Sequence, residues 1–280
     1  MCFCHFIQSN LTFSTIKSLK FQETGVAKLK AYTIEKKDRG YLLFTITRNE
    51  KRNAVDYEVM EGLLEVIQQA KEPDIKALVI TGEGSRAFCS GGDLAVFHAL
   101  STHEEACEML SKMSAILYSL LTLPKPTLGL VNGHAVGGGC EILTACDFRI
   151  ARSGIKAGFV QGKQAITTGW GGGTILAEKL SAPKAMKLLM DAELRPVEEL
   201  KAEGFIDEIY HSEALMACEY FLDKMLSLEA SVLQSYKNIM IRKWEEAKLQ
   251  ERMEAEVQNC SYLWESDAHH LYVHNFLNKK

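Results

Sequence analysis

Two glycine-rich turns contain the residue types in this sequence that could perform chemistry. Residues 87–94 read AFCSGGDL and residues 131–141 read VNGHAVGGGCE, and each turn follows a run typical of a buried strand. Glycine allows the backbone to approach a ligand closely, and the start of a helix presents free N–H groups with a partial positive charge. Two such turns side by side predict two N–H groups aimed at one developing oxyanion. Either turn alone is also typical of an ordinary strand-to-helix connection.

Glu141 lies in the first turn of the helix predicted to follow the second glycine cluster. A carboxylate in the first turn of a helix either caps the helix dipole or serves as a general acid/base. His134 is a lone histidine in a turn, which favours a structural hydrogen bond. Cys89 and Cys140 have no paired histidine, so their pattern indicates packing groups rather than nucleophiles. A phosphate loop is disfavoured, because residues 137–139 are not followed by Lys-Ser/Thr and no GxGxxG is present there.

Alternating strand and helix patterns position these turns. Strands are predicted over residues 41–47, 77–81, 127–131 and 148–151, and helices over 56–70, 104–121, 138–145, 185–189, 197–203, 213–228 and 231–264. Asp56 is the expected N-cap of the first helix, and Gly204 is expected to end the helix over 197–203. A third glycine cluster, residues 171–173, is typical of close packing at a helix start. The alternation predicts an α/β fold with crossover connections.

Composition excludes several classes of protein. The chain has 280 residues, 47% hydrophobic and 24% charged, with 32 Lys+Arg against 36 Asp+Glu. Such a chain can bury a full core, and it lacks the basic footprint of a nucleic-acid binder. No apolar run reaches the roughly 18 residues of a membrane span. Eight cysteines at irregular spacings, without CxxC, argue against a metal site and predict reduced thiols in a cytoplasmic protein.

The first thirty residues differ from the rest and are predicted to be a poorly ordered extension. They lack a continuous apolar core for a secretory signal. Their acid-poor, Ser/Thr-containing composition leaves a transit peptide open, and a misassigned start is a further alternative. We expect a core over residues 31–205 and a helical region over 206–280.

The ordered motifs resemble those of the enoyl-CoA hydratase/isomerase (crotonase) superfamily from Ala31 to the end of the chain. Residues 48–55 (RNEKRNAV) resemble the family's R-P-x-x-x-N-A-L segment, and residues 77–94 resemble its first oxyanion turn. Residues 124–126 and 131–151 resemble its central signature, and residues 202–207 (AEGFID) resemble its A-x-x-x-G-L-V-D.

The resemblance implies a crotonase spiral of repeated ββα turns, capped by a C-terminal helical trimerisation region. It also implies an acyl-CoA substrate, a homotrimer or a dimer of trimers, and no cofactor apart from the coenzyme A of the substrate. A nucleic-acid or membrane partner is not expected.

The same resemblance assigns site residues. The N–H groups of Gly92 and Gly138 would hold the thioester oxygen, and Glu141 would be one of two catalytic glutamates. Further substrate-binding positions lie at the coenzyme A entrance, beside the first oxyanion turn, and in a C-terminal helix that covers the adenine of a neighbouring subunit: Lys51, Arg52, Ala54, Asp93, Leu94, Phe276 and Lys279.

One departure from the family pattern bears on the reaction. The stretch that carries the second glutamate in hydratases reads AGFVQGKQAITT here, and an ungapped match places Gln161 at the glutamate position. Glutamine cannot exchange a proton at neutral pH, so hydration should be impaired. Phe159-Val160, followed by GWGG at residues 169–172, is similar to the ethylmalonyl-CoA decarboxylase branch. The sequence therefore favours decarboxylation of a malonyl-type ester, with Gln161 and Trp170 shaping the pocket. Trp170 is equally typical of core packing.

Other reactions stay open. Glu141 alone could support some hydration of a 2-enoyl-CoA, and double-bond isomerisation also needs only one proton-shuttling group. The phrase FCSGGD at residues 88–93 also occurs in naphthoate synthases of the superfamily, although the rest of their acceptor signature is not visible. A non-catalytic RNA-binding or scaffold relative is disfavoured by the net charge of -4 and by the retained glutamate.

Overall fold

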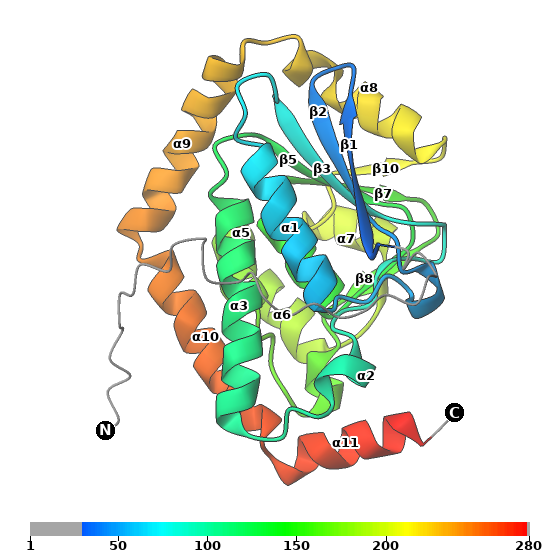
Figure 1. Cartoon of the computed structure of the whole chain (residues 1–280), viewed down its shortest axis with the longest axis vertical. Helices are drawn as coiled ribbons and strands as arrows, with labels where there is room; N and C mark the ends of the chain where they lie inside the picture. Colours follow the sequence, from blue (N-terminus) through cyan, green and yellow to red (C-terminus); the bar gives the residue numbers. More distant parts are fainter. Residues whose placement is uncertain (1–29, 279–280) are drawn as a thin grey trace, which may run out of the picture.

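The computed structural model describes residues 30–278, and a six-stranded sheet with the order β1-β2-β3-β5-β7-β10 runs through it (Figure 1). Its strands are β1 (Tyr32–Lys37), β2 (Tyr41–Ile46), β3 (Ala77–Gly82), β5 (Thr127–Val131), β7 (Phe148–Arg152) and β10 (Glu208–Tyr210). The edge strand β1 pairs antiparallel with β2, and the other pairings are parallel. Parallel neighbours require crossover connections, and helices supply most of them.

A smaller sheet lies beside the first and has the order β4-β6-β8-β9. Its strands are β4 (Ala87–Cys89), β6 (His134–Val136), β8 (Lys156–Gly158) and β9 (Arg195–Pro196). Successive turns of the chain thus add one strand to each sheet, which confirms the α/β spiral. Each glycine-rich turn contains a short strand of the smaller sheet, β4 or β6, so the β4–β6 pairing brings the two turns together.

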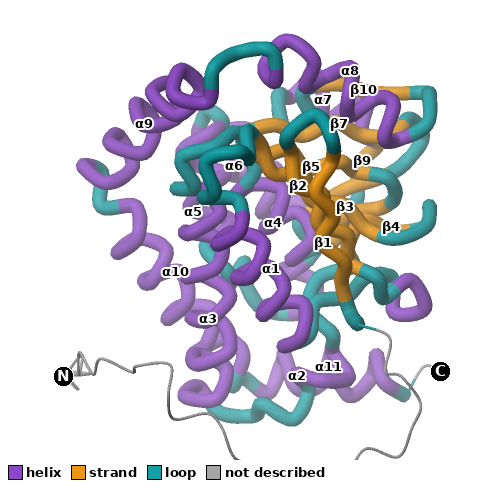
Figure 2. The backbone as a smooth tube through the Cα atoms, turned by 45° about the horizontal axis from the view of Figure 1, so that its top comes forward, coloured by secondary structure: helices purple, strands orange, loops and turns teal. Residues whose placement is uncertain are grey.

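Helices cover both faces of the large sheet. The α-helices of the described chain are α1 (Tyr57–Gln69), α2 (Leu94–Phe97), α3 (His103–Leu121), α4 (Gly138–Ala145), α5 (Gly172–Lys179), α6 (Ala182–Asp191), α7 (Val197–Glu203), α8 (Ala214–Leu226), α9 (Ala230–Glu246), α10 (Leu249–Trp264) and α11 (Asp267–Leu277). Two short 3-10 helices are η1 (Asn49–Lys51) and η2 (Gln161–Gln164). Figure 2 shows α1, α3, α4, α5 and α10 on one side of the strands.

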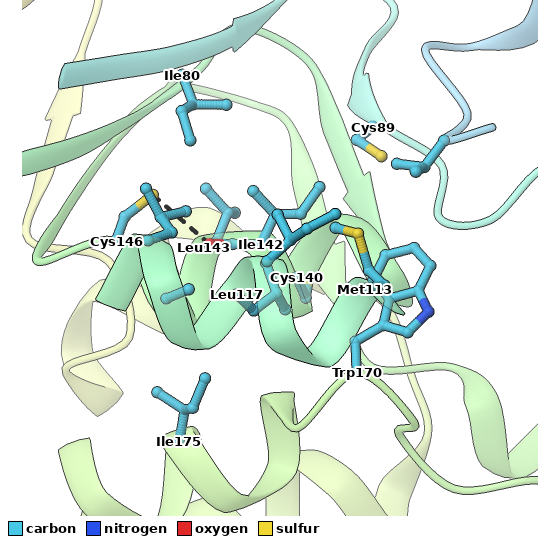
Figure 3. Packing of buried hydrophobic residues seen from close by; sticks show 14 of the residues in the cluster. Ile80, Cys89, Met113, Leu117, Cys140, Ile142, Leu143, Cys146, Trp170 and Ile175 are labelled. Carbon is cyan, nitrogen blue, oxygen red and sulfur yellow. Dashed lines mark hydrogen bonds between the residues drawn. The ribbon is translucent and has the colours of Figure 1, made fainter. Parts of the chain in front are cut away.

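The main hydrophobic core lies between the large sheet and those helices. Figure 3 shows part of it, where Ile80 of β3, Leu117 of α3, Ile142 of α4 and Ile175 of α5 are buried in one cluster. On the opposite face, α8 packs Leu222 and its neighbours against β2, β3, β5 and β7. The short helix α4 is buried along its whole length, so the residues at its start have a fixed position.

Most predicted elements are confirmed, including the Asp56 N-cap of α1 and the end of α7 at Gly204. The single helix predicted over 231–264 is wrong: it is two helices, because Ala247 ends α9 and Lys248 has a positive φ of 53° before α10 begins. The core expected over 31–205 also extends further, since β10 joins the large sheet beyond that boundary. The extension predicted over 1–30 lies outside the described residues, apart from residue 30.

Among residues 30–278, no helix combines the length and the apolar character needed to cross a bilayer.

Candidate active site

The two predicted oxyanion donors, Gly92 and Gly138, both line one cavity. Gly138 is the first residue of α4, so its N–H has no partner within the helix. In the described residues, neither N–H donates a hydrogen bond to the protein. The two turns lie against each other, because a Cβ built on Gly91 would come within 3.2 Å of the Gly138 nitrogen. The site therefore presents two free backbone donors to a ligand oxygen.

The segment before α1 holds the first turn in place. The backbone of Val55 donates to Gly91 O at 2.8 Å and accepts from Asp93 N at 2.8 Å, which leaves the Gly92 amide between them unpaired. The Arg48 guanidinium donates to Asp93 Oδ2 at 2.7 Å and to Ala54 O at 2.6 Å. This partly buried ion pair fixes the loop that carries the donor.

The indole of Trp170 lies directly against the second turn. A Cβ built on Gly138 would lie 2.2 Å from Cζ3 of this ring, and one built on Gly92 would lie 3.6 Å from Cζ2. Trp170 is 4% exposed and belongs to the main core. Both interpretations from the sequence hold, because the ring packs in the core and also forms a wall of the cavity.

The cavity has a volume of about 90 Å³, opens to solvent and is mostly apolar. Its lining comes from the two turns, α2, α3, η2, the segment before α5, and α10: Ser90, Gly91, Gly92, Leu94, Phe97, Met109, Leu110, Gly137, Gly138, Glu141, Val160, Gln161, Gln164, Ile166, Thr167, Gly169, Trp170, Cys260 and Trp264. This described lining has one carboxylate, Glu141, and no lysine, arginine or histidine.

Glu141 caps the start of α5 rather than its own helix. Its Oε2 accepts hydrogen bonds from the N–H groups of Trp170 at 2.9 Å and Gly172 at 3.0 Å. The approach requires glycine at 172, because a Cβ there would lie 2.4 Å from Cγ of Glu141. This contact explains the third glycine cluster as close packing at a helix start.

Burial controls the protonation of Glu141, which is 2% exposed. Desolvation, followed by the nearby charge of Glu256, raises the pKa of Glu141 to about 8. The hydrogen bonds from Trp170, Gly172 and Gln161 favour the charged form and act in the opposite direction. At neutral pH the carboxyl group therefore mainly holds a proton and can act as an acid.

Gln161 is the side-chain partner of this carboxyl group. Its Nε2 donates to Glu141 Oε1 at 2.9 Å. Gln161 is 8% exposed, and its Oε1 is buried without a hydrogen-bond partner among the described residues. The amide thus has one acceptor group available within the cavity.

The remaining residues predicted to bind substrate are more distant from the chemistry. Leu94 lines the cavity, whereas Lys51, Arg52 and Ala54 do not. Lys51 and Arg52 are exposed and lie beside Ser90, a residue of the cavity lining, because the Ser90 N–H donates to Arg52 O at 3.1 Å. They therefore flank the rim of the cavity. Asp93 is not part of the lining, and its carboxylate binds Arg48 and the N–H of Ala95.

The C-terminal positions are not brought to the cavity. Phe276 of α11 is 45% exposed and is not among the lining residues, and Lys279 lies outside the described range.

The other polar and thiol groups near the turns have structural roles, as the sequence indicated. Nδ1 of His134 accepts a hydrogen bond from Lys156 N at 3.0 Å. Burial raises the pKa of Cys89 to about 12 and raises that of Cys140 still further, so both thiols stay protonated.

Sequence reasoning missed the far wall of the cavity. Met109 and Leu110 come from α3, and Cys260 and Trp264 come from one face of α10. Their helical spacing was visible, but it could not distinguish a cavity wall from ordinary core.

Comparisons with known proteins agree with this geometry. The family model described as enoyl-CoA hydratase/isomerase matches residues 36–280. An ethylmalonyl-CoA decarboxylase of Rattus norvegicus is 31% identical over 236 residues, covering 82% of this chain and 78% of that protein. The mitochondrial methylglutaconyl-CoA hydratase of Homo sapiens is 30% identical over 183 residues, covering 65% of this chain and 54% of that protein.

Solved structures show the same fold. An enoyl-CoA hydratase from Bacillus halodurans has a TM-score of 0.80 at 24% identity, covering 88% of this chain and 99% of its own. An enoyl-CoA hydratase/isomerase from Xanthobacter autotrophicus has a TM-score of 0.82 at 19% identity, covering 90% and 94%. From the family match and the decarboxylase likeness together, this chain belongs to the enoyl-CoA hydratase/isomerase family.

Proposed function

We propose that this enzyme decarboxylates a malonyl-type CoA thioester and reprotonates the resulting enolate through Glu141. The observation that carries the proposal is the pairing of one buried carboxyl group with an amide. Glu141 is the one carboxylate in the described cavity lining, and Gln161 occupies the adjacent position. Such a pair can deliver one proton, which is what an enolate requires.

The reaction would start at the oxyanion site. The N–H groups of Gly92 and Gly138 donate to the thioester oxygen, the bond to the carboxylate breaks, and its electrons form the enolate as CO₂ leaves. Glu141 then transfers its proton to the α-carbon, and solvent restores that proton. A pKa of about 8 suits this acid at neutral pH.

The cavity also suits loss of a carboxylate. The described lining offers no cation to stabilise the substrate carboxylate, whereas neutral CO₂ is compatible with apolar walls. When Glu141 holds its proton, a half-turn of the Gln161 amide would let the Glu141 hydroxyl donate to Oε1. The Gln161 NH₂ would then face the substrate carboxylate and orient it.

The likeness to ethylmalonyl-CoA decarboxylases adds support, because those relatives carry that activity in their names. The test is a mass-spectrometric product assay that offers ethylmalonyl-CoA and crotonyl-CoA to the purified enzyme in parallel. We expect loss of CO₂ from ethylmalonyl-CoA. Dominant addition of water to crotonyl-CoA would overturn the proposal.

A hydratase is the second candidate, and the unpartnered Oε1 of Gln161 favours it. That oxygen could accept a hydrogen bond from a water molecule beside Glu141. Methylglutaconyl-CoA hydratases are among the similar proteins, so methylglutaconyl-CoA is the third substrate in the assay. Some of these relatives are named as mitochondrial, and imaging of a tagged full-length chain would test the cytoplasmic location expected from the sequence.

A further inference from the structure

Two carboxylates from distant parts of the chain share the start of α5. The carboxylate of Glu141 from α4 accepts hydrogen bonds from the N–H groups of Trp170 and Gly172. The carboxylate of Glu256 from α10 accepts hydrogen bonds from the N–H groups of Gly173 at 3.1 Å and Thr174 at 2.6 Å. The first hydrogen bond within the helix is donated by Ile175. All three unpaired N–H groups of the first turn are therefore divided between two acids.

We propose that Glu256 is a positioning residue for the transfer of a proton from Glu141. The charge of Glu256, at the same end of α5, keeps Glu141 in its proton-bearing form. The N–H groups of Trp170 and Gly172 then orient the Glu141 carboxyl group. This inference rests on the proposed role of Glu141 as proton donor. Glu256 does not line the cavity, so it would act only through Glu141.

The difference in burial decides which acid holds the proton. Glu256 is half-buried, so water can solvate its charge, whereas Glu141 is almost fully buried. Two like charges at one helix end repel each other, and the less solvated group gives up its charge. No salt bridge within residues 30–278 neutralises Glu256, so its field acts on Glu141.

The other groups around Glu141 do not compete for this role. The thiols of Cys140 on α4 and Cys260 on α10 remain protonated, because burial raises the pKa of both. The η2 helix contributes the neutral Gln161 amide, and α3 contributes only apolar side chains to the cavity wall. Glu256 is thus the charged group that faces Glu141.

The test is the titration of the Glu141 carboxyl carbon by NMR in full-length protein labelled with ¹³C-glutamate, assigned by its absence in Glu141→Gln. We expect Glu256→Gln to move this titration to lower pH by about one pH unit, with the pH profile of turnover moving equally. Glu254→Gln is the matched control, because Glu254 lies exposed on the same helix and its side chain accepts a hydrogen bond only from Gln250 among residues 30–278. This control variant should move neither the titration of Glu141 nor the pH profile of turnover.

A second variant, Glu256→Ala, guards against a poor fit of glutamine at this position. Alanine removes the charge and lets water bind the N–H groups of Gly173 and Thr174. An unmoved titration in either folded variant would overturn the inference, even if turnover fell, because a purely structural cap would give that result. The titration does not depend on the reaction. A shifted titration in an enzyme without decarboxylase activity would support this inference and refute the proposed reaction.

Discussion

The side-chain nitrogen of Gln161 lies 2.9 Å from Oε1 of Glu141, so an amide is the side-chain partner of the proposed catalytic acid. A carboxylate at this position would share a proton with Glu141, and the pair could deliver and remove protons in one cycle. The Gln161 amide cannot remove a proton from the substrate or from water, but it keeps the hydrogen bond to Glu141. In the proposed mechanism, the reaction thus depends on whether residue 161 has a carboxylate oxygen or an amide nitrogen at this position.

Replacing Gln161 with glutamate should restore a hydratase-like pair. We expect Gln161→Glu to raise water addition to crotonyl-CoA by about 10-fold or more, since a second acid/base becomes available. The measurement is the initial hydration rate at several pH values. Gln164→Glu is the matched control, because it also lines the cavity but makes no hydrogen bond to Glu141. An equal gain in both variants would show that added charge, and not the pair, is responsible.

Removing the acid should separate catalysis from binding. We expect Glu141→Gln to reduce turnover by about 100-fold or more, because no other carboxyl group lines the described cavity. Affinity for a non-reactive CoA ketone analogue, which keeps the carbonyl oxygen of the thioester, should be largely retained, as calorimetry would show, since the oxyanion donors are unchanged. Full turnover in this variant would exclude Glu141 as the proton donor.

A methyl group on the second oxyanion turn should disturb the site through Trp170. In Gly138→Ala the new Cβ would lie 2.2 Å from the indole, so the ring or the N–H must move. We expect kcat/KM to fall by about 100-fold or more, as for loss of one oxyanion donor.

The double variant Gly138→Ala with Trp170→Leu separates the two causes, because leucine removes the clashing ring. Recovery of kcat/KM in the double variant would show that the turn itself tolerates alanine. A persistent loss with normal thermal stability would place the defect in the donor geometry.

The sequence predicted that Gly92, Gly138 and Glu141 belong to one site, and they line one cavity, because each position depends on local pattern. Gly92 and Gly138 follow strands, and Glu141 lies at a fixed spacing from the second turn. The pairing of Glu141 with α5 was not predictable, since it joins residues 31 positions apart and depends on how α4 packs on α5. Glu256 was hidden for the same reason, because its contacts with Gly173 and Thr174 join residues 83 and 82 positions apart.

The break between α9 and α10 shows another limit of local pattern. No glycine or proline marks it, and Lys248 adopts a left-handed conformation that sequence alone disfavours. Packing of α10 against α3 and α5 compensates for that cost. The same packing brings Cys260 and Trp264 to the cavity.

The pH dependence of stability gives a test of Glu141 that needs no substrate. Its pKa rises from 4.5 to about 8 on folding, so between these values the folded state binds more protons than the unfolded state. The free energy of unfolding should therefore fall as pH rises through this window, by several kcal/mol if the whole shift is realised.

Glu141→Gln should remove that component. The wild-type protein must be compared with the variant at each pH, because Lys179 also changes the stability. Burial lowers the pKa of Lys179 to about 7, so this group makes the free energy of unfolding rise with pH above about pH 7. Urea midpoints of the wild-type protein and the variant, measured at intervals from about pH 5 to about pH 8.5, provide this comparison. The wild-type midpoint should fall more steeply with pH than that of the variant. Parallel curves would mean that Glu141 titrates at its ordinary pKa, and the acid step would then need another proton source.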